Sequence, residues 1–242
     1  MIFMPIFKRE NIDFSPIEKL GVSAGTVAMM WFNKYSGFIF KTPTKEIIVD
    51  PVDIQSDARG ILNPDIIFIS HEHFDHYDPR VIKDLLRDKT HVLAPPHITR
   101  DLSGIIPVDR LHEMKPGDEF KLEDVKIIAE KAQHPSPLPL TMVLFTEDDI
   151  RIYHAIDSMT FSDMRNIGEK YGLDIAIVPI GIAPGTSPEE GVRAIELLKP
   201  KLAIPHHATG GFEKFEKLIK QKLPGIQVKI LKKGEIYTYT KG

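Results

Sequence analysis

The chain has 242 residues, with 31 lysines and arginines against 34 aspartates and glutamates, and contains no cysteine. That length is ample for a buried core, and we expect one domain over residues 1–242. The lack of cysteine excludes disulfide frameworks, iron–sulfur clusters, thiolate zinc sites and a cysteine nucleophile. The near-balanced charge gives no general attraction to nucleic acid or anionic membranes, and no apolar run approaches a membrane helix of ~20 residues. Without a signal-peptide pattern either, a cytoplasmic protein is expected.

Apolar stretches of strand length, separated by polar turns, recur along the chain. They predict strands at residues 27–32, 37–41, 46–49, 66–69, 92–94, 125–129, 140–145, 150–156, 175–180 and 202–204. The first three are typical of an antiparallel meander, and the continuous apolar run at 66–69 of a strand buried on both faces. Alternation at 226–230, followed by the turn Lys232-Lys233-Gly234, predicts a closing hairpin with 235–240.

Four helices are expected between these strands. Asp78-Pro79 and Ser187-Pro188 each combine an N-cap with proline at the first helical position, and Glu190 completes a capping box with Ser187. The other two helical patterns cover residues 161–171 and 212–222. Strands thus outnumber helices, which favours two mixed sheets packed face to face with helices outside over a doubly wound parallel sheet.

The segment that points to chemistry follows the predicted strand at 66–69 and reads His71-Glu72-His73-Phe74-Asp75-His76. Three histidines and an aspartate at these positions coincide by chance in roughly one such sequence in a thousand. In extended chain His71 and His73 project to the same side, and a turn at Phe74 would carry Asp75 and His76 to a second metal. Imidazole and carboxylate suit zinc, manganese, iron or nickel when thiolates are absent. The helical metalloprotease pattern His-Glu-x-x-His is excluded, because Asp75 stands where the second histidine is required.

Six residues cannot complete two metal sites, so further ligands are expected at other strand ends. His134 follows the strand at 125–129, Asp157 closes the one at 150–156, and the pair His206-His207 follows 202–204. Each has a structural alternative. His134 would be a lone surface histidine, Asp157 would N-cap the next helix, and one member of the pair is expected to face away.

The remaining histidines are assigned structural roles. His91, His97 and His112 have no comparable neighbours in the sequence and are expected to be structural or solvated. His154 shares a strand face with isoleucines, which favours core packing. Glu72 alternates away from the two ligands beside it, so we expect it to support the loop and not to act as a base.

This succession of motifs resembles the metallo-β-lactamase fold superfamily. Residues 71–76 match its central His-x-His-x-Asp-His motif, His134 its third motif and Asp157 its bridging carboxylate, while Asp50 resembles the aspartate that closes an early strand. The stretch Ile204-Pro205-His206-His207 resembles the branch that contains ascorbate-6-phosphate lactonase, and places the last ligand on His207. The resemblance implies an α+β fold, a four-layer αββα sandwich with a dinuclear site at one edge.

Two positions depart from that branch. Its relatives often read Gly-His-Ser where this chain has Lys34-Tyr35-Ser36, so Tyr35 replaces a histidine on the substrate side. They commonly read Gly-Asp-Thr where this chain has Ile156-Asp157-Ser158. Neither change removes a metal ligand, but both bear on which substrate is used.

The function implied is that of a hydrolase with two divalent ions, Zn²⁺ before Mn²⁺, with iron and nickel as further candidates. The ions' bridging hydroxide would attack a small ester, lactone or phosphodiester. The first ion is assigned to His71, His73 and His134, and the second to Asp75, His76 and His207, with Asp157 bridging. Asp75 is also the catalytic candidate, because it could orient the hydroxide.

Two rival functions start from the same residues. A metal-dependent nuclease acting on RNA or DNA would need a basic track, and the lysines at 214–222 and 232–233 are interleaved with glutamates or few in number. A non-catalytic metal-binding partner protein would not need an open metal position. We therefore expect a small-molecule substrate without nucleic-acid or membrane partners. The sequence does not decide between a monomer and a homo-oligomer.

Overall fold

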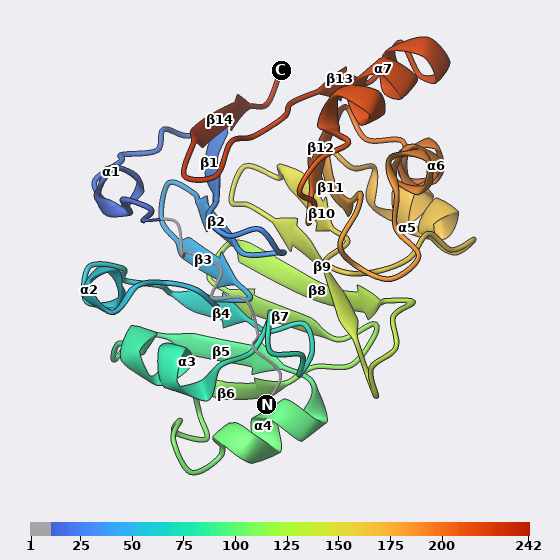
Figure 1. Ribbon diagram of the computed structural model, residues 1–242. Helices are drawn as coiled ribbons and strands as arrows, with labels where there is room; N and C mark the ends of the chain where they lie inside the picture. Colours follow the sequence, from blue (N-terminus) through green and yellow to red (C-terminus); the bar gives the residue numbers. More distant parts are fainter. Residues whose placement is uncertain (1–10) are drawn as a thin grey trace, which may run out of the picture.

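The computed structural model of the protein describes residues 11–242, which build two seven-stranded sheets (Figure 1). The first sheet has the order β14-β1-β2-β3-β4-β5-β6. Its strands are β1 (Thr26–Trp31), β2 (Phe38–Lys41), β3 (Glu46–Val49), β4 (Ile66–Phe68), β5 (His91–Ala94), β6 (Leu111–Glu113) and β14 (Ile236–Thr240). The meander β1-β2-β3 is antiparallel as predicted, whereas β3, β4, β5 and β6 run parallel.

The second sheet has the order β13-β12-β11-β10-β9-β8-β7. Its strands are β7 (Glu119–Leu122), β8 (Val125–Lys131), β9 (Leu140–Phe145), β10 (Arg151–His154), β11 (Ile175–Pro179), β12 (Leu202–His206) and β13 (Gln227–Val228). Strands β7 to β10 are antiparallel and β10 to β13 parallel. The parallel run matters for the site, because it brings the ends of β10 and β12 to the same edge of the sheet.

Helices cover the outer face of each sheet (Figure 1). On the first sheet lie α1 (Ser15–Glu18), α2 (Ser56–Arg59), α3 (Pro79–Leu85) and α4 (Pro96–Leu102). On the second lie α5 (Met164–Tyr171), α6 (Pro188–Leu198) and α7 (Phe212–Lys222). The central core lies between the sheets, where side chains such as Phe40, Phe68 and Ile152 are buried. The predicted α+β four-layer sandwich is therefore confirmed.

The local signals for helix starts are also confirmed. The Asp78 side chain accepts a hydrogen bond from Arg80 N at 2.9 Å, and Ser187 Oγ accepts one from Glu190 N at 3.1 Å. Proline occupies the first turn of both helices. The short elements α1, α2, α4, β6 and β7 were not predicted, because helices of four to seven residues and partly exposed edge strands carry little periodicity.

The predicted closing hairpin is wrong. Gln227–Val228 pairs in parallel with β12 in the second sheet, and Ile236–Thr240 pairs antiparallel with β1 in the first. The turn at Lys232-Lys233-Gly234 carries the chain from one sheet to the other, and Gly234 N donates to Trp31 O at 2.8 Å. Each strand thus covers an otherwise open sheet edge, which stabilises both sheets more than a hairpin that leaves both edges bare.

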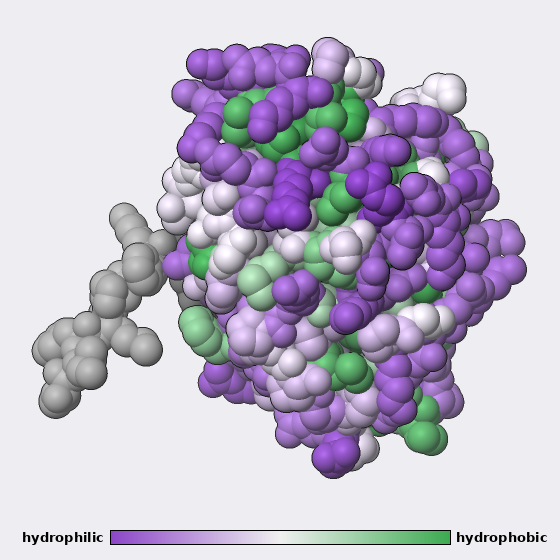
Figure 2. Space-filling view, turned by 90° about the vertical axis from the view of Figure 1, so that its right-hand side faces the viewer, coloured by the Kyte–Doolittle hydropathy of each residue, from purple (hydrophilic) through white to green (hydrophobic). Residues whose placement is uncertain are grey.

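The surface over α5, α6 and α7 is mainly hydrophilic, with apolar residues in small separate groups (Figure 2). Within residues 11–242, none of the helices has the length and apolar character needed to cross a bilayer. The cytoplasmic location stays a prediction.

Candidate metal centre

The predicted ligands come together where the two sheets meet at one edge. The loop after β4 carries residues 71–76, and the loops after β8, β10 and β12 carry His134, Asp157 and His207. The structure brings these seven residues into two groups of potential metal ligands, and the ligand atoms within each group all lie within 4.8 Å of one another. Residues from four strand ends, spread over more than half of the chain, therefore form one centre.

Unusual backbone conformations mark three of the strand ends at this centre. Asp50, Ile156 and His207 have positive φ angles of 46°, 55° and 50°. A left-handed conformation is disfavoured for residues with a Cβ, most of all for branched isoleucine, and costs on the order of 1–3 kcal/mol. At the end of β10 this kink precedes Asp157, and at the end of β12 it occurs at His207 itself. These strained backbone conformations turn the side chains of Asp157 and His207 toward the centre.

The first group contains three imidazoles. His71 Nε2 and His134 Nε2 each lie 3.1 Å from His73 Nδ1, so three ring nitrogens converge on one point. His71 is buried, and its other nitrogen, Nδ1, lies 2.9 Å from Ser70 Oγ. Because that hydroxyl donates its hydrogen to Asp50 Oδ2 at 2.7 Å, it must accept from His71 Nδ1. This fixes the tautomer of His71 and leaves the lone pair of Nε2 directed at the group.

The second group contains two carboxylates and two imidazoles. His76 Nε2 lies 3.1 Å from Asp157 Oδ2 and 3.8 Å from Asp75 Oδ2. His207 Nδ1 lies 2.7 Å from Asp157 Oδ1, and His207 Nε2 lies 4.0 Å from Asp75 Oδ2. His76, Asp157 and His207 are buried, while Asp75 is partly open to solvent. Four potential donors thus surround one small space, which suits a cation better than a simple ion pair does.

Asp50 holds both groups from behind. Its Oδ2 lies 2.7 Å from His76 Nδ1 and accepts the Ser70 hydroxyl, and its Oδ1 accepts Ser70 N at 2.8 Å. The His76 Nδ1 contact leaves Nε2 of the same ring as the free ligand atom. Ser36 has a similar role on the other side, where its hydroxyl donates to Asp157 Oδ1 at 2.9 Å. Nothing in the sequence around Ser36 points to this contact, and Asp50 was singled out only by resemblance.

The charges of the second group are suited to a cation. Burial by itself lowers the pKa of His76, but the carboxylates of Asp157 and Asp50 raise it to about 10. Burial opposes ionisation of Asp157, yet His76 and His207 hold its pKa well below the usual value. Without a metal, a proton on His76 therefore balances the buried carboxylates. A divalent ion would replace that proton.

The first group has the opposite character. Burial lowers the pKa of His71, and the neighbouring charge of His76 lowers it further. Burial likewise lowers the pKa of His134. Both imidazoles are neutral at physiological pH, which is the state in which a histidine binds metal.

The residues fit metal ions by their unused donors as well. His207 Nε2 is buried and makes no hydrogen bond to any residue in the described range, and Asp75 Oδ2 lies 4.0 Å from it. Unpartnered buried polar atoms are costly in a folded protein. A buried imidazole nitrogen without a partner, beside two carboxylates, is accounted for if a cation binds there.

Two structural alternatives from the sequence are not supported by the geometry. The helix after Asp157 begins at Met164 with Asp163 at its N-cap position, so Asp157 does not cap it. His134 is half-buried against His71 and His73 and is not an isolated surface residue. The bridging role of Asp157 stays a prediction.

The adjacent His206 and His207, at the end of β12 and just after it, point in different directions, as expected. His207 belongs to the second group, while His206 is buried with its ring 4.8 Å from that of His154. Burial lowers the pKa of His154 to about 3 and holds that of His206 well below its usual value. His154 Nε2 lies 3.0 Å from Ser36 O, so the predicted core position of His154 is confirmed. Tyr35 lies edge-on to His207, with ring centroids 5.7 Å apart.

His97 has a structural role, one of the two alternatives expected for it. Its Nε2 lies 3.1 Å from Glu72 Oε2, which also accepts the Ser136 hydroxyl at 2.7 Å. Glu72 thereby ties α4 and the loop of His134 to the ligand loop, in agreement with the supporting role predicted for it. His91 and His112 contact each other at 3.0 Å, away from the centre.

A pocket of about 490 Å³ gives access to the centre. Both metal groups contribute to its lining, through His73 and His134 from the first and Asp75, Asp157 and His207 from the second. The remaining lining residues are Glu72, Phe74, Ile182, Ala183 and Pro184. A substrate entering this pocket would reach both groups at once.

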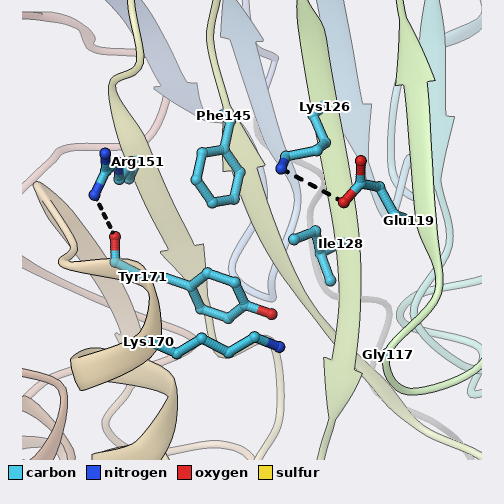
Figure 3. Close-up of a pocket in the computed structure, with 8 residues that line it drawn as sticks. All are labelled: Gly117, Glu119, Lys126, Ile128, Phe145, Arg151, Lys170 and Tyr171. Carbon is cyan, nitrogen blue, oxygen red and sulfur yellow. Dashed lines mark hydrogen bonds and ion pairs between the residues drawn. The ribbon is translucent and has the colours of Figure 1, made fainter.

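A second hollow, of about 410 Å³, lies on the outer face of β7 to β10, beside the end of α5 (Figure 3). Lys126, Arg151 and Lys170 surround the ring of Phe145 and the side chain of Tyr171 there. Each of these cations has a carboxylate partner: Lys126 is 3.4 Å from Glu119, Arg151 2.6 Å from Asp149, and Lys170 3.4 Å from Glu130. The charges are thus balanced locally, and the hollow does not extend the metal centre.

Known proteins are similar to this chain in sequence and in fold. Residues 29–207 match the family model described as a beta-lactamase superfamily domain. Two relatives described as UPF0173 metal-dependent hydrolases come from Thermofilum pendens and Staphylothermus marinus. They are 33% and 31% identical to the chain, covering 91% and 92% of it and 97% and 98% of their own lengths.

Solved structures agree on the fold. Igni18, a metallo hydrolase from Ignicoccus hospitalis, aligns with a TM-score of 0.79 at 23% identity, over 90% of this chain and all of its own. The metallo-beta-lactamase fold protein YhfI from Bacillus subtilis aligns with a TM-score of 0.73 at 15% identity, over 89% of this chain and all of its own.

Proposed function

Because this chain belongs to the beta-lactamase superfamily and is one of its metal-dependent hydrolases, we propose that it hydrolyses a small ester, lactone or phosphodiester at a dinuclear centre. The single observation that carries the proposal is that both groups of potential ligands line one pocket. A substrate bound there meets both groups, whereas separate structural metal sites would have no reason to share an entrance.

The ligands would divide between two ions. His71, His73 and His134 would hold the first, and Asp75, His76 and His207 would hold the second, with Asp157 as the shared carboxylate. Imidazole and carboxylate without thiolate favour Zn²⁺, then Mn²⁺, with iron and nickel as further candidates. When bound, two divalent ions supply a nucleophile from water at neutral pH and polarise the bond that is attacked.

The protein's own groups prepare the centre for this chemistry. Asp50 and Ser70 fix the tautomers of His76 and His71, so that both Nε2 lone pairs face inward. Ser36 orients Asp157 by its hydrogen bond. Asp75 is partly open to the pocket and is placed to orient the attacking water, which is the catalytic role we assign to it.

The nuclease alternative has less support. None of the described residues that line the pocket is a lysine or an arginine. On α7, Lys220 pairs with Glu216 at 2.6 Å, and Lys214 pairs with Glu189 of α6. A polynucleotide needs cations along its path to bind, so these paired charges favour a small substrate.

A substrate panel tests the proposal. Protein loaded with Zn²⁺ or Mn²⁺ is assayed with acyl esters, lactones, phosphodiesters and single-stranded RNA, and Asp75→Asn serves as the inactive control. We expect turnover of at least one small ester or lactone, lost in Asp75→Asn and on metal removal. Cleavage of RNA faster than every small substrate would replace the proposal with the nuclease alternative.

A further inference from the structure

The walls of the pocket above the metal groups are apolar. Phe74, between the ligands His73 and Asp75, is 82% exposed, and Ile182 is 36% exposed. Both line the pocket, together with Ala183 and Pro184. Phe74 comes from the loop after β4 in the first sheet, and the other three from the loop after β11 in the second. The apolar surface is thus supplied by both halves of the sandwich at the entrance to one site.

Exposure alone would not distinguish Phe74, since single exposed apolar residues are common on protein surfaces. Val108, for example, is 91% exposed but does not line the pocket. The position of Phe74 is what matters. Neighbouring positions 73, 75 and 76 turn their side chains toward the metal groups, and the loop is closed by hydrogen bonds of 2.9 Å from His76 N and Tyr77 N to His73 O. Of the two positions in residues 71–76 that are not potential ligands, Glu72 contacts His97 and Ser136, and Phe74 carries an exposed aromatic ring.

The other wall is held rigidly against the centre. Ile182 N donates to the carbonyl oxygen of the ligand residue His207 at 2.8 Å. Thr186 closes the following turn, because its N and Oγ1 donate to Ala183 O at 3.2 and 2.6 Å. An apolar wall fixed in this way needs little rearrangement to bind a ligand, so less binding free energy is lost to ordering.

The charges at the entrance disfavour an anionic substituent. Besides the residues of the two metal groups, the only ionisable side chain among the described lining residues is that of Glu72. Its carboxylate is held at the pocket by Ser136 and His97. A negatively charged tail extending from the reacting bond would therefore meet a carboxylate and apolar side chains, without a lysine or arginine among them.

We infer that the pocket binds an uncharged carboxylic ester or lactone whose apolar acyl or alkyl chain packs against Phe74 and Ile182. This rests on the proposed function for the reacting end and adds the recognition of the rest of the substrate. Burial of a methylene against such walls strengthens binding by about two- to fourfold. Affinity should therefore rise with chain length, and a terminal charge should abolish much of that rise.

Hydroxamic acids test the inference by binding, without turnover. The series from acetohydroxamate to octanohydroxamate is titrated calorimetrically into Zn²⁺-loaded protein, with suberic acid monohydroxamate as the charged match for octanohydroxamate. We expect affinity to rise by about two- to fourfold per methylene, and suberic acid monohydroxamate to bind about tenfold more weakly than octanohydroxamate. Acetohydroxamate reports on the metal centre alone.

Variants assign the effect to the walls. Phe74→Ala and Ile182→Ala should each lower the affinity for octanohydroxamate by about tenfold and leave the affinity for acetohydroxamate within about twofold of the parent's. Val108→Ala, which removes an exposed apolar side chain away from the pocket, should match the parent throughout. A flat dependence on chain length, or an unchanged slope in both wall variants, would overturn the inference. If affinity rises with chain length as expected but no ester is hydrolysed, the proposed function is contradicted, while the inference that the walls bind an apolar chain is upheld.

Discussion

Replacing Asp50 with asparagine should weaken metal binding although Asp50 is not a ligand. Its two oxygens accept three donors, namely Ser70 N, Ser70 Oγ and His76 Nδ1, at 2.7 to 2.8 Å. An amide has only one oxygen, so in either orientation its NH₂ group faces a donor. If the NH₂ replaces Oδ1 it opposes Ser70 N, which leaves a buried donor unsatisfied at a cost of about 1–3 kcal/mol.

The other orientation of Asp50→Asn damages the metal group. If the NH₂ replaces Oδ2, it faces His76 Nδ1, and the ring escapes the conflict by moving its proton to Nε2. That proton then occupies the lone pair that points into the second group. Loss of such a supporting partner typically costs 10–100-fold in metal affinity, or about 1.4–2.7 kcal/mol.

Competition titration with a chromophoric chelator measures the effect on each ion. We expect Asp50→Asn to lower the affinity for one of the two Zn²⁺ ions by about 10–100-fold. Asp174→Asn is the matched control, because Asp174 is also buried, accepts Arg151 N at 2.9 Å and forms an ion pair with Lys201 at 2.8 Å. It should lose stability without losing metal affinity. Parental affinity for both ions in Asp50→Asn would refute the tautomer argument.

Three further substitutions test individual residues of the centre and of the fold. Asp157→Asn should lower turnover by more than about 100-fold and lower the affinity for at least one ion, because a shared negative charge is lost. Near-parental turnover would limit Asp157 to a structural role. His207→Ala should lose an ion by elemental analysis while His206→Ala keeps both, and the reverse would shift the ligand by one residue. Burial and the Glu18 carboxyl raise the pKa of Glu46 to about 8, so the folded state retains a proton that the unfolded state loses near pH 4.5. The free energy of unfolding should therefore fall, by a few kcal/mol at most, as pH rises from about 4.5 to 8. Chemical denaturation should show a smaller dependence of stability on pH in Glu46→Gln. The same pH dependence in both proteins would contradict this prediction.

Much of the centre could be predicted because its ligands lie at strand ends that the sequence marks clearly. The run at 66–69 identifies a buried strand, and the six residues from His71 to His76 follow it without interruption. The lone His134, Asp157 and His207 became candidates only through their positions after other strands. The parallel run from β10 to β12 brings Asp157 and His207 to one edge. His134 reaches the same edge because β8 and β10 are both antiparallel to β9 and therefore run in the same direction.

The parts that could not be predicted depend on contacts between distant segments. Ser36 reaches Asp157 across 121 residues, and nothing around Ser36 distinguishes it from an ordinary turn serine. His97 contacts Glu72 only because α4 packs beside the ligand loop. The prediction of a closing hairpin was wrong for the same reason. Alternation predicts a strand at Ile236–Thr240 but does not show whether that strand pairs with β13 or β1.

The metal content of the purified chain tests the dinuclear centre most directly. Metal-free protein is prepared with a chelator, supplied with excess Zn²⁺ or Mn²⁺, freed of loosely bound ions and analysed for metal and protein. The two groups of ligands predict two ions per chain, and one in His207→Ala. One ion or fewer in the parent protein, with both metals, would contradict the account.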